Sequence, residues 1–269
     1  MRIKILKAAS APLAVVFRQG PPRQTQQLLW NLDTDELVPG QWIKAYLTIS
    51  DCDLSPDGRY LLGVFQDDRF KRQERAVDGG LKQALPYWTA LSKPPYFTAL
   101  AIWFHQAPYD HKGGYWHNAS ELRVSMPDRD WDRGKFLCAP PFDVRHETNP
   151  RRRSVTALQM VRSGWARRSD DAPSAKAPST WVKAGDRVTL RRRVRLVLDD
   201  VWAVELGQNR TIDDIQPSFL EFDSRGRVIF AQDGRLFAWE NCPQGSPKLI
   251  ADLTSNRFEP APAPNDYFS

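Results

Sequence analysis

Three histidines and one aspartate lie close together in the segment FHQAPYDHKGGYWH. They are His105, Asp110, His111 and His117. Imidazole and carboxylate groups are common ligands of zinc and other divalent metals, so this segment holds a candidate metal site. Successive histidines are six residues apart, which matches no familiar ligand motif, and the Gly-Gly pair between them favours a loop tip. Hydrogen-bonded or exposed histidines at a hairpin turn are therefore the alternative interpretation.

A second group of side chains could bind a polyanion such as nucleic acid. Residues 145–195 hold twelve arginines and two lysines against four acidic residues, although the whole chain has a formal net charge of +6. Residues 186–198 alternate as a strand does, which places most of their arginines on one face and Arg192 on the apolar face. The candidate polyanion-binding residues are Arg151, Arg152, Arg153, Arg167, Arg168, Arg187, Arg191, Arg193 and Arg195. A solvated or edge strand, whose charges block association between sheets, is the alternative.

Other patterns of reactive residues are absent from the sequence. Asp51, Asp53 and Asp57 superficially resemble a calcium loop, but Pro56 stands where an EF-hand needs glycine. The chain contains no GxSxG, GxxxxGK[ST], HExxH or GxGxxG motif. The sequence therefore favours a non-catalytic protein, and we expect no cofactor.

The cysteines and the hydropathy indicate the compartment. The three cysteines are far apart, odd in number and without CxxC spacing, so neither a disulfide framework nor a cysteine-based zinc site is indicated. No window approaches the ~20 apolar residues that a membrane-spanning helix needs. We therefore expect a protein of the cytoplasm that does not enter a membrane.

The elements that carry these residues are expected to be short strands joined by tight turns. In ISDCDLSPDGRYLLGVF, residues 49–65, Pro56 presets the backbone of a turn and Gly58 accepts a positive φ. Apolar residues flank this turn, so the segment predicts a β-hairpin. A similar pattern recurs in FLEFDSRGRVIFAQDGRLFAWE, residues 219–240, with Gly226 in its first turn. Twenty-one prolines and fifteen glycines also suit many short strands better than long helices.

The segment DLSPDGRYLLGVF resembles the repeat of TolB-like and WD40-like β-propellers, in which an SPDG turn joins the two inner strands of a blade. Residues 219–240 resemble a degenerate copy of it, and LLWNLDTDELVPG, residues 28–40, is similar to the outer half of a blade. The resemblance covers about a third of the chain. Gly58 and Gly226 are 168 residues apart, which equals four periods of 42 and allows five or six blade-like units. We therefore expect an all-β, irregular β-propeller.

We expect residues 1–269 to form a single propeller-like domain with three irregular parts. Residues 67–95 lack the propeller pattern and predict an insertion that holds a short helix or a loop. Residues 145–195 form the basic irregular region. Residues 257–269 are rich in proline and predict an extended tail on the surface.

The function that best fits this organisation is a non-catalytic protein-interaction module, or a scaffold subunit of a larger assembly, because rigid β scaffolds present loops for recognition. Tyr87, Trp88, Tyr115 and Trp116 are candidate interface anchors, although such aromatic residues could equally form the core. A nucleic-acid-contacting subunit that uses the basic region is the first alternative. A metal-dependent hydrolase that uses the histidines of residues 105–117 is the second.

Overall fold

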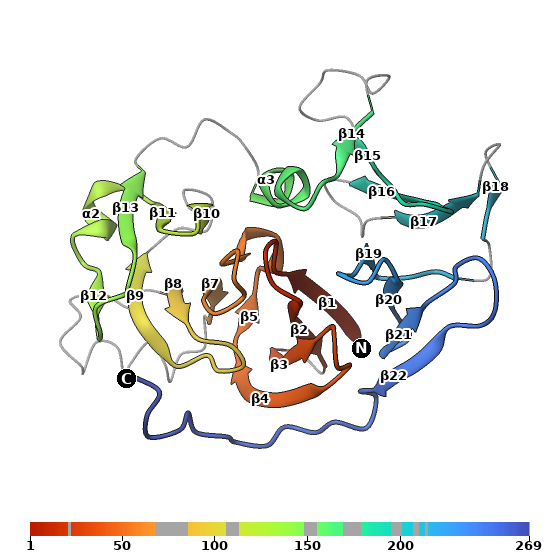
Figure 1. Cartoon of the computed structure of the whole chain (residues 1–269). Coiled ribbons are helices and arrows are strands. Elements are labelled where there is room, and N and C mark those ends of the chain that lie inside the picture. The colour runs from red at the N-terminus through yellow and green to blue at the C-terminus, as the bar shows by residue number, and fades with distance from the viewer. Residues whose placement is uncertain are drawn as a thin grey trace.

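The computed structural model describes residues 1–20, 23–67, 86–105, 113–147, 155–168, 179–194, 201–206, 210–212 and 215–268. These residues form five β-sheets that follow one another around a common centre, as Figure 1 shows. The expected all-β fold is confirmed, and the arrangement is that of a five-bladed β-propeller in which each sheet is one blade.

The first two blades are built mainly from consecutive antiparallel strands. In the first blade the order follows the chain, with β1 (Arg2–Lys7), β2 (Leu13–Gln19), β3 (Gln24–Asn31) and β4 (Leu37–Lys44). The second blade contains β5 (Tyr46–Leu47), β6 (Asp53–Leu54), β7 (Leu61–Gln66), β8 (Tyr87–Ser92), β9 (Ala99–His105) and β12 (Lys135–Phe136). A turn of 3-10 helix, η1 (Ile49–Asp51), precedes β6.

The third blade is irregular, because the chain leaves it and returns. It contains β10 (Gly114–Asn118), β11 (Glu121–Ser125) and β13 (Asp143–Glu147). Between β11 and β13 the chain forms α2 (Asp128–Trp131) and adds β12 to the outer edge of the second blade. The returning strand β13 therefore pairs in parallel with β11.

The remaining elements complete the ring. Helix α3 (Val155–Arg162) follows the third blade, and among the described residues no helix is both long and apolar enough to cross a membrane. The fourth blade contains β14 (Ala166–Arg167), β15 (Ser179–Ala184), β16 (Thr189–Val194), β17 (Val201–Leu206) and β18 (Arg210–Thr211). The fifth blade contains β19 (Phe219–Phe222), β20 (Val228–Gln232), β21 (Arg235–Trp239) and β22 (Lys248–Asp252).

The two predicted turns have the expected backbone geometry. Gly58 adopts a φ of +77° and donates its N–H to the carbonyl of Ser55 at 2.9 Å, in the hairpin between β6 and β7. Gly226 adopts a φ of +75° in the corresponding hairpin between β19 and β20. A third hairpin, between β20 and β21, has positive φ at both Asp233 and Gly234, which is the type I′ geometry that suits twisted strands. The residues of these turns thus determine where the paired strands of the second and fifth blades begin and end.

The structure corrects one expected boundary. Residues 67–95 were expected to be an insertion, but β8 lies within this segment and is a central strand of the second blade, paired with β7 and β9. Residues 68–85, where a short helix or loop was expected, lie outside the described residues. The pattern was missed because β8 is buried on both faces and so shows no alternation of polar and apolar residues.

Apolar clusters lie between neighbouring blades. Ile3 and Ile5 of the first blade pack against Ile229 and Leu236 of the fifth. The first and second blades share another cluster, the second and third blades share one with the C-terminal tail, and the fourth and fifth share one with α3. Because each blade buries its faces against its neighbours, the ring needs no core other than these interfaces.

The ring closes through side chains rather than through a shared strand. Among the described residues, no strand of the fifth blade joins the sheet of the first. Arg227, which is only 3% exposed, donates to Asp35 at 2.7 and 3.0 Å and to the carbonyl of Leu32 at 2.8 Å. Its Nε also donates to Asp223 at 2.6 Å within its own blade. This guanidinium therefore joins the first and last blades together with the apolar cluster that they share.

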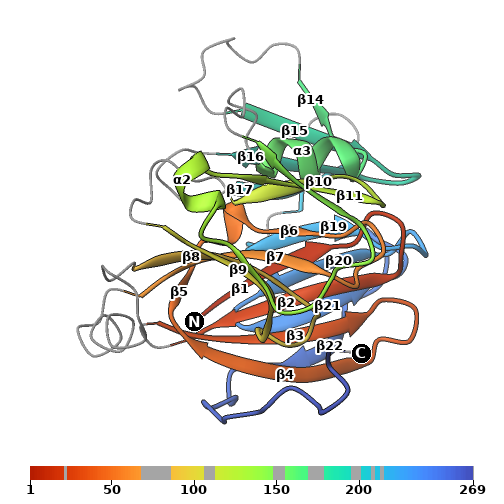
Figure 2. The same cartoon turned by 90° about the vertical axis from the view of Figure 1, so that its left-hand side faces the viewer.

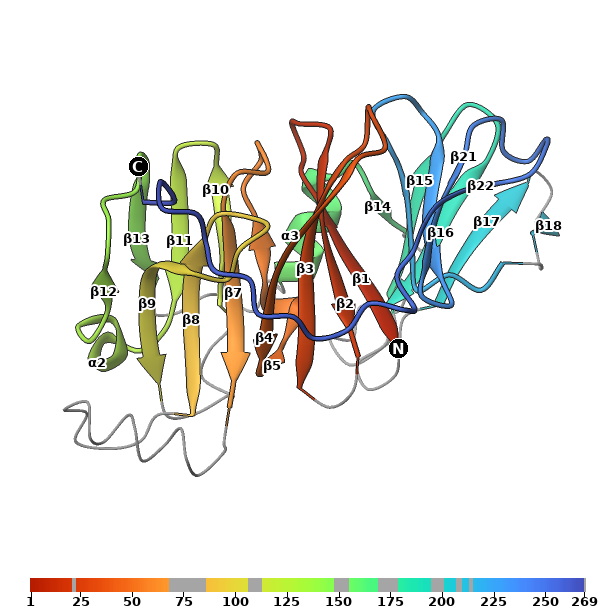
Figure 3. The ribbon, with the colours of Figure 1, turned by 90° about the horizontal axis from the view of Figure 1, so that it is seen from below.

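The C-terminal segment then crosses the outside of the ring, as the dark blue trace in Figure 3 shows. It leaves β22 and passes the first blade, where Phe258 packs edge-on against Trp42 with ring centroids 5.9 Å apart. The Tyr267 hydroxyl reaches the second blade, donates to the carbonyl of Thr98 at 2.5 Å and accepts from the N–H of Lys93 at 2.7 Å. Burial of Tyr267, which is 4% exposed, raises the pKa of its hydroxyl. The C-terminal segment thus leaves the fifth blade and contacts both the first and the second.

Replacing Asp35 with asparagine should weaken ring closure in a pH-dependent way. Hydrogen bonds from Arg227 lower the pKa of Asp35, so its contribution to stability is fully present above the usual aspartate pKa of about 3.9. That contribution is lost as the pH falls through the lower folded value. At neutral pH we expect Asp35→Asn to reduce the free energy of unfolding by about 1–2 kcal/mol, and this difference should shrink in acid. Urea denaturation at several pH values measures it.

The matched control is Asp33→Asn in the same turn, because Asp33 is exposed and accepts a hydrogen bond from Ser224. We expect a smaller loss there. An Asp35→Asn defect that persists unchanged in acid would contradict the assigned role of the ion pair.

Candidate functional site

Helix α3 fills the space between the third and fourth blades and forms part of the inner wall of the ring (Figure 1). The helix ends in a Schellman motif, in which the N–H of Trp165 bonds to the carbonyl of Met160 and that of Gly164 bonds to Val161. Gly164 takes the left-handed conformation, with a φ of +80°. Met160 and Trp165 are buried against the fourth and fifth blades, which fixes the face that α3 turns to the centre.

Asp53 is the main contact of α3 with the blades. Its carboxylate is 1% exposed and accepts from both terminal nitrogens of Arg162, at 2.6 and 3.0 Å. It also accepts from the side chain of Gln159 at 3.0 Å, from the N–H of Trp116 at 2.8 Å and from that of Leu54 at 3.0 Å. One buried carboxylate thus joins β6, β10 and α3, and its charge is matched by a bidentate guanidinium.

A second buried carboxylate lies across the centre on β19. Glu221 accepts from the ammonium of Lys183 at 2.7 Å and from the indole N–H of Trp165 at 2.8 Å. Lys183 also donates to the carbonyl of Ser163 at 2.6 Å, just after α3. This pair therefore attaches the segment just after α3 to the fourth and fifth blades, as Asp53 attaches the last turn of the helix to the second and third.

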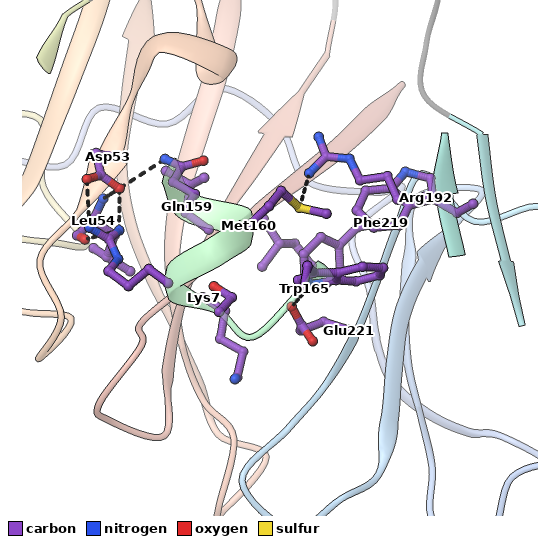
Figure 4. Close-up of a pocket in the computed structure, with 14 residues that line it drawn as sticks. Lys7, Asp53, Leu54, Gln159, Met160, Trp165, Arg192, Phe219 and Glu221 are labelled. Carbon is purple, nitrogen blue, oxygen red and sulfur yellow. Dashed lines mark hydrogen bonds and ion pairs between the residues drawn. The ribbon is translucent and has the colours of Figure 1, made fainter. Parts of the chain in front are cut away.

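Between these two ion pairs lies a small central cavity of about 50 Å³ (Figure 4). It is lined by Ile5, Leu6, Lys7, Asp53, Leu54, Gln159, Met160, Arg162, Ser163, Trp165, Arg192, Trp202, Phe219 and Glu221. Such a volume holds about three or four water molecules. Sites for drug-sized ligands occupy roughly 300–1,000 Å³, so the cavity is too small for a nucleotide or a peptide.

Lys7, at the end of β1, is a charged cavity residue that stands outside both ion pairs, as does Arg192 on β16. In the described part of the chain its ammonium makes no hydrogen bond and no ion pair. Burial lowers the pKa of Lys7, Glu221 opposes this shift, and the nearby Lys183 adds to it. In Figure 4, Lys7 and Glu221 lie together on one side of the cavity, and Arg192 lies over Met160 on the other.

A larger groove opens on the other side of α3, between this helix and β10, which Figure 2 also shows side by side. Its volume is about 550 Å³, within the range of sites that bind ligands. It is lined by Tyr115, Trp116, His117, Ala157, Leu158, Val161 and Arg162. These residues include no acidic side chain. Val161 is 63% exposed, the highest value among the exposed large apolar side chains that the structure describes.

The candidate metal ligands are only partly described. His105 is 1% exposed in β9, lies 3.4 Å from the hydroxyl of Thr89 and stacks on Tyr87. His117 is exposed on β10, in a different blade. Asp110 and His111 lie outside the described residues. Within the described residues, no three His, Cys, Asp or Glu side chains come together as a metal site would require.

The candidate interface aromatics divide into two kinds. Trp88 and Trp116 are 4% and 3% exposed and belong to the core, Trp88 by stacking on Phe65 at 5.3 Å. The prediction that these two tryptophans are exposed interface anchors is therefore wrong, and the alternative that they are core residues is correct. Tyr87 and Tyr115 are half-buried, and Tyr115 lines the groove.

The basic strand has the predicted faces. Leu190 is fully buried, and Arg192 lies on the same side, where its guanidinium stands 4.5 Å from the ring centre of Trp202 and contacts the sulfur of Met160 at 3.0 Å. Stacking and the aliphatic stem explain how an arginine is accommodated on the apolar face. On the opposite face Arg191 forms an ion pair with Glu205 at 3.1 Å.

The other candidate polyanion contacts are spread over several elements. Arg187 is exposed and donates to Asn241 at 3.2 Å. Arg193 on β16 and Arg167 and Arg168 around β14 are exposed as well. The remaining candidates, Arg151, Arg152, Arg153 and Arg195, lie outside the described residues.

Sequence patterns did not single out the residues that meet at the centre. Lys7, Arg162, Lys183 and Glu221 come from four separate elements, and no local spacing relates them. The one available signal was a charge inside an otherwise apolar strand, as in Glu221 of FLEF. A buried charge of this kind needs a partner, but its position alone does not identify the partner.

Comparisons with known proteins add little to this description. No protein-family model matches the chain, and no curated protein matches its sequence. Among solved structures, the chain is similar to the β-propeller domain of the Trilobed protease from Pyrococcus furiosus, which is described as having an open velcro topology. The TM-score is 0.30 and the identity 10%, and the match covers 90% of this chain and 82% of that chain. A likeness this distant carries no inference about function.

Removing the guanidinium from α3 should destabilise the protein strongly. Arg162→Met leaves the carboxylate of Asp53 buried without its counter-charge, so we expect a loss of about 3–5 kcal/mol in the free energy of unfolding. Guanidinium chloride denaturation measures this loss. The double variant Asp53→Asn with Arg162→Met removes both charges and should recover part of the stability.

The control is Arg145→Met, which removes an arginine that is 60% exposed and whose ion pair with Glu121 spans 3.7 Å. Exposed pairs contribute little, so this variant should retain nearly all of the stability. Equal losses in the two single variants would show that Asp53 does not depend on Arg162.

Proposed function

We propose that this chain is a non-catalytic β-propeller module that binds a segment of a partner protein in the groove between β10 and α3. The observation that carries the proposal is the groove itself. It is large enough for side chains of a peptide, and its helical wall exposes Val161 to solvent. Val161 stands beside Leu158 and Tyr115 in the same lining, and contiguous apolar surface of this kind, unlike a single exposed side chain, marks a recognition surface.

The chemistry of the groove indicates the kind of segment that fits. Leu158, Val161 and the ring of Tyr115 supply apolar surface, and burying such surface is favourable by about 25 cal/mol per Å². Arg162 is already paired with Asp53, which leaves His117 as the other basic side chain of the described lining, and that lining includes no Asp or Glu. An apolar anchor residue in a segment that is neutral or acidic would therefore suit the groove best.

The rigidity of the walls supports the proposal. The helical wall is fixed by the contacts of Arg162 and Gln159 with Asp53, and the strand wall by the N–H of Trp116, which donates to the same carboxylate. Because both walls are fixed by the buried carboxylate of Asp53, they are already ordered before a partner binds. This lowers the entropic cost of binding.

The resemblance of the SPDG repeats to TolB-like and WD40-like propellers agrees with a scaffold role. The proposal also assumes a cytoplasmic protein, because the three cysteines are free and would stay reduced there. Contact with nucleic acid is a competing function. The exposed positions of Arg167, Arg168 and Arg193 favour it, and Arg191 forms an ion pair with Glu205.

Photo-crosslinking tests the proposed surface. Val161 is replaced with p-benzoylphenylalanine, and the protein is irradiated in its native host with and without nuclease. We expect one nuclease-resistant protein adduct, which mass spectrometry identifies. The same replacement at Leu249, which is 49% exposed on β22, is the matched control and should not give this adduct.

The identified partner is then purified and titrated. Val161→Asp should weaken its binding about tenfold or more, because a charge at the apolar contact cannot be buried cheaply, whereas Leu249→Asp should leave binding unchanged. Adducts that are identical at both positions would contradict the groove as the binding surface. Adducts removed by nuclease would favour nucleic acid as the ligand instead.

A further inference from the structure

The central cavity holds a positive charge that its own acidic residues do not neutralise. Asp53 is matched by Arg162 at 2.6 Å, and Glu221 is matched by Lys183 at 2.7 Å. Lys7 lines the same cavity as a further cation, without a hydrogen bond or ion pair in the described part of the chain. The cavity therefore has a donor group, free volume and an excess of positive charge in one place.

The carboxylate nearest to Lys7 is already occupied. Glu221 accepts from Lys183 and from the N–H of Phe222 with one oxygen, and from the indole of Trp165 with the other. It attracts Lys7 through space but forms no ion pair with it. A lysine ammonium has three donors, and no acceptor among the described residues takes one of those of Lys7.

We propose that the central cavity binds a compact oxyanion, such as inorganic phosphate or a short carboxylate, at the ammonium group of Lys7. The oxyanion supplies the acceptors and the counter-charge that Lys7 does not find among the described residues, and the nearby Lys183 adds to the positive field around it. Apolar neighbours, among them Leu54, Met160 and Phe219, strengthen this attraction by excluding water.

The size of the cavity limits the ligand. About 50 Å³ admits an ion of a few heavy atoms in place of three or four water molecules, and excludes nucleotides and sugar phosphates. The site is thus separate from the 550 Å³ groove on the other face of α3, and it does not depend on the protein-binding function proposed for that groove.

Thermal unfolding and calorimetry of the full-length chain test this site. The protein is titrated with sodium phosphate and, separately, with sodium acetate, while sodium chloride keeps the ionic strength constant. We expect a saturable rise in Tm and a saturable binding heat with at least one of the two anions. The anion with the lower Kd identifies which source of the oxyanion the site prefers.

Variants at Lys7 assign the effect to the cavity. Lys7→Met keeps the length of the side chain but removes its charge, and should weaken binding about 10- to 100-fold, as expected for a lost charge-assisted hydrogen bond. Lys7→Arg keeps the charge and should retain binding. Lys135→Met makes the same change at an exposed position on the outer strand β12, and should bind as the wild-type protein does.

Two results would overturn the proposal. One is the absence of any saturable change in Tm and in heat for the wild-type protein with both anions, which would leave water as the occupant. The other is an equal response of the wild-type protein and Lys7→Met, which would place the anion elsewhere on this basic chain. If Lys7→Met does not fold, Lys7→Gln decides between these outcomes in the same way.

Discussion

The carboxylate of Asp53 accepts five hydrogen bonds, from Arg162, Gln159, Trp116 and Leu54, and it does so at 1% exposure. A buried carboxylate is costly unless it is paired and fully hydrogen-bonded, so these contacts must form together. They come from the second blade, the third blade and α3. The position of α3, and with it the shape of both the cavity and the groove, follows from the need to satisfy this one side chain.

The ring departs from regular blades where α3 stands between the third and fourth sheets. Two ion pairs hold the helix there, one through Asp53 and one through Glu221 and Lys183. A shifted register would leave these buried charges without partners, which disfavours other positions of the helix. The position of the helix is therefore fixed, although it exposes an apolar edge at Val161 on one side and lines a charged cavity on the other.

The closure of the ring follows the same rule. Arg227 joins the first and fifth blades through Asp35, and the C-terminal segment then crosses the first blade to bury Tyr267 against the second. Both contacts link parts of the chain that are remote in sequence. Because no strand is shared between the described parts of the first and fifth blades, these side-chain contacts and the apolar cluster between the two blades hold the ring closed.

Much of the fold could be predicted from local chemistry. The turns at Gly58 and Gly226 were recognisable because a positive φ is accessible to glycine at little cost, and this preference does not depend on the rest of the protein. The alternation that placed Arg192 on the apolar face of β16 is equally local. Strand β8 escaped prediction because a strand buried on both faces loses that alternation.

The candidate site was decided by tertiary structure alone. From the sequence, Trp88 and Trp116 could be either interface anchors or core residues. Only the packing of the blades showed that both are buried. The partners at the centre are equally hidden, since Asp53 and Arg162 are 109 residues apart. The sequence by itself determined the turns and the strands beside them, because backbone preferences act over a few neighbouring residues, and its resemblance to propeller repeats indicated the fold class. The tertiary structure decided which charged residues pair, because burial and pairing depend on contacts that form only when all five blades are in place.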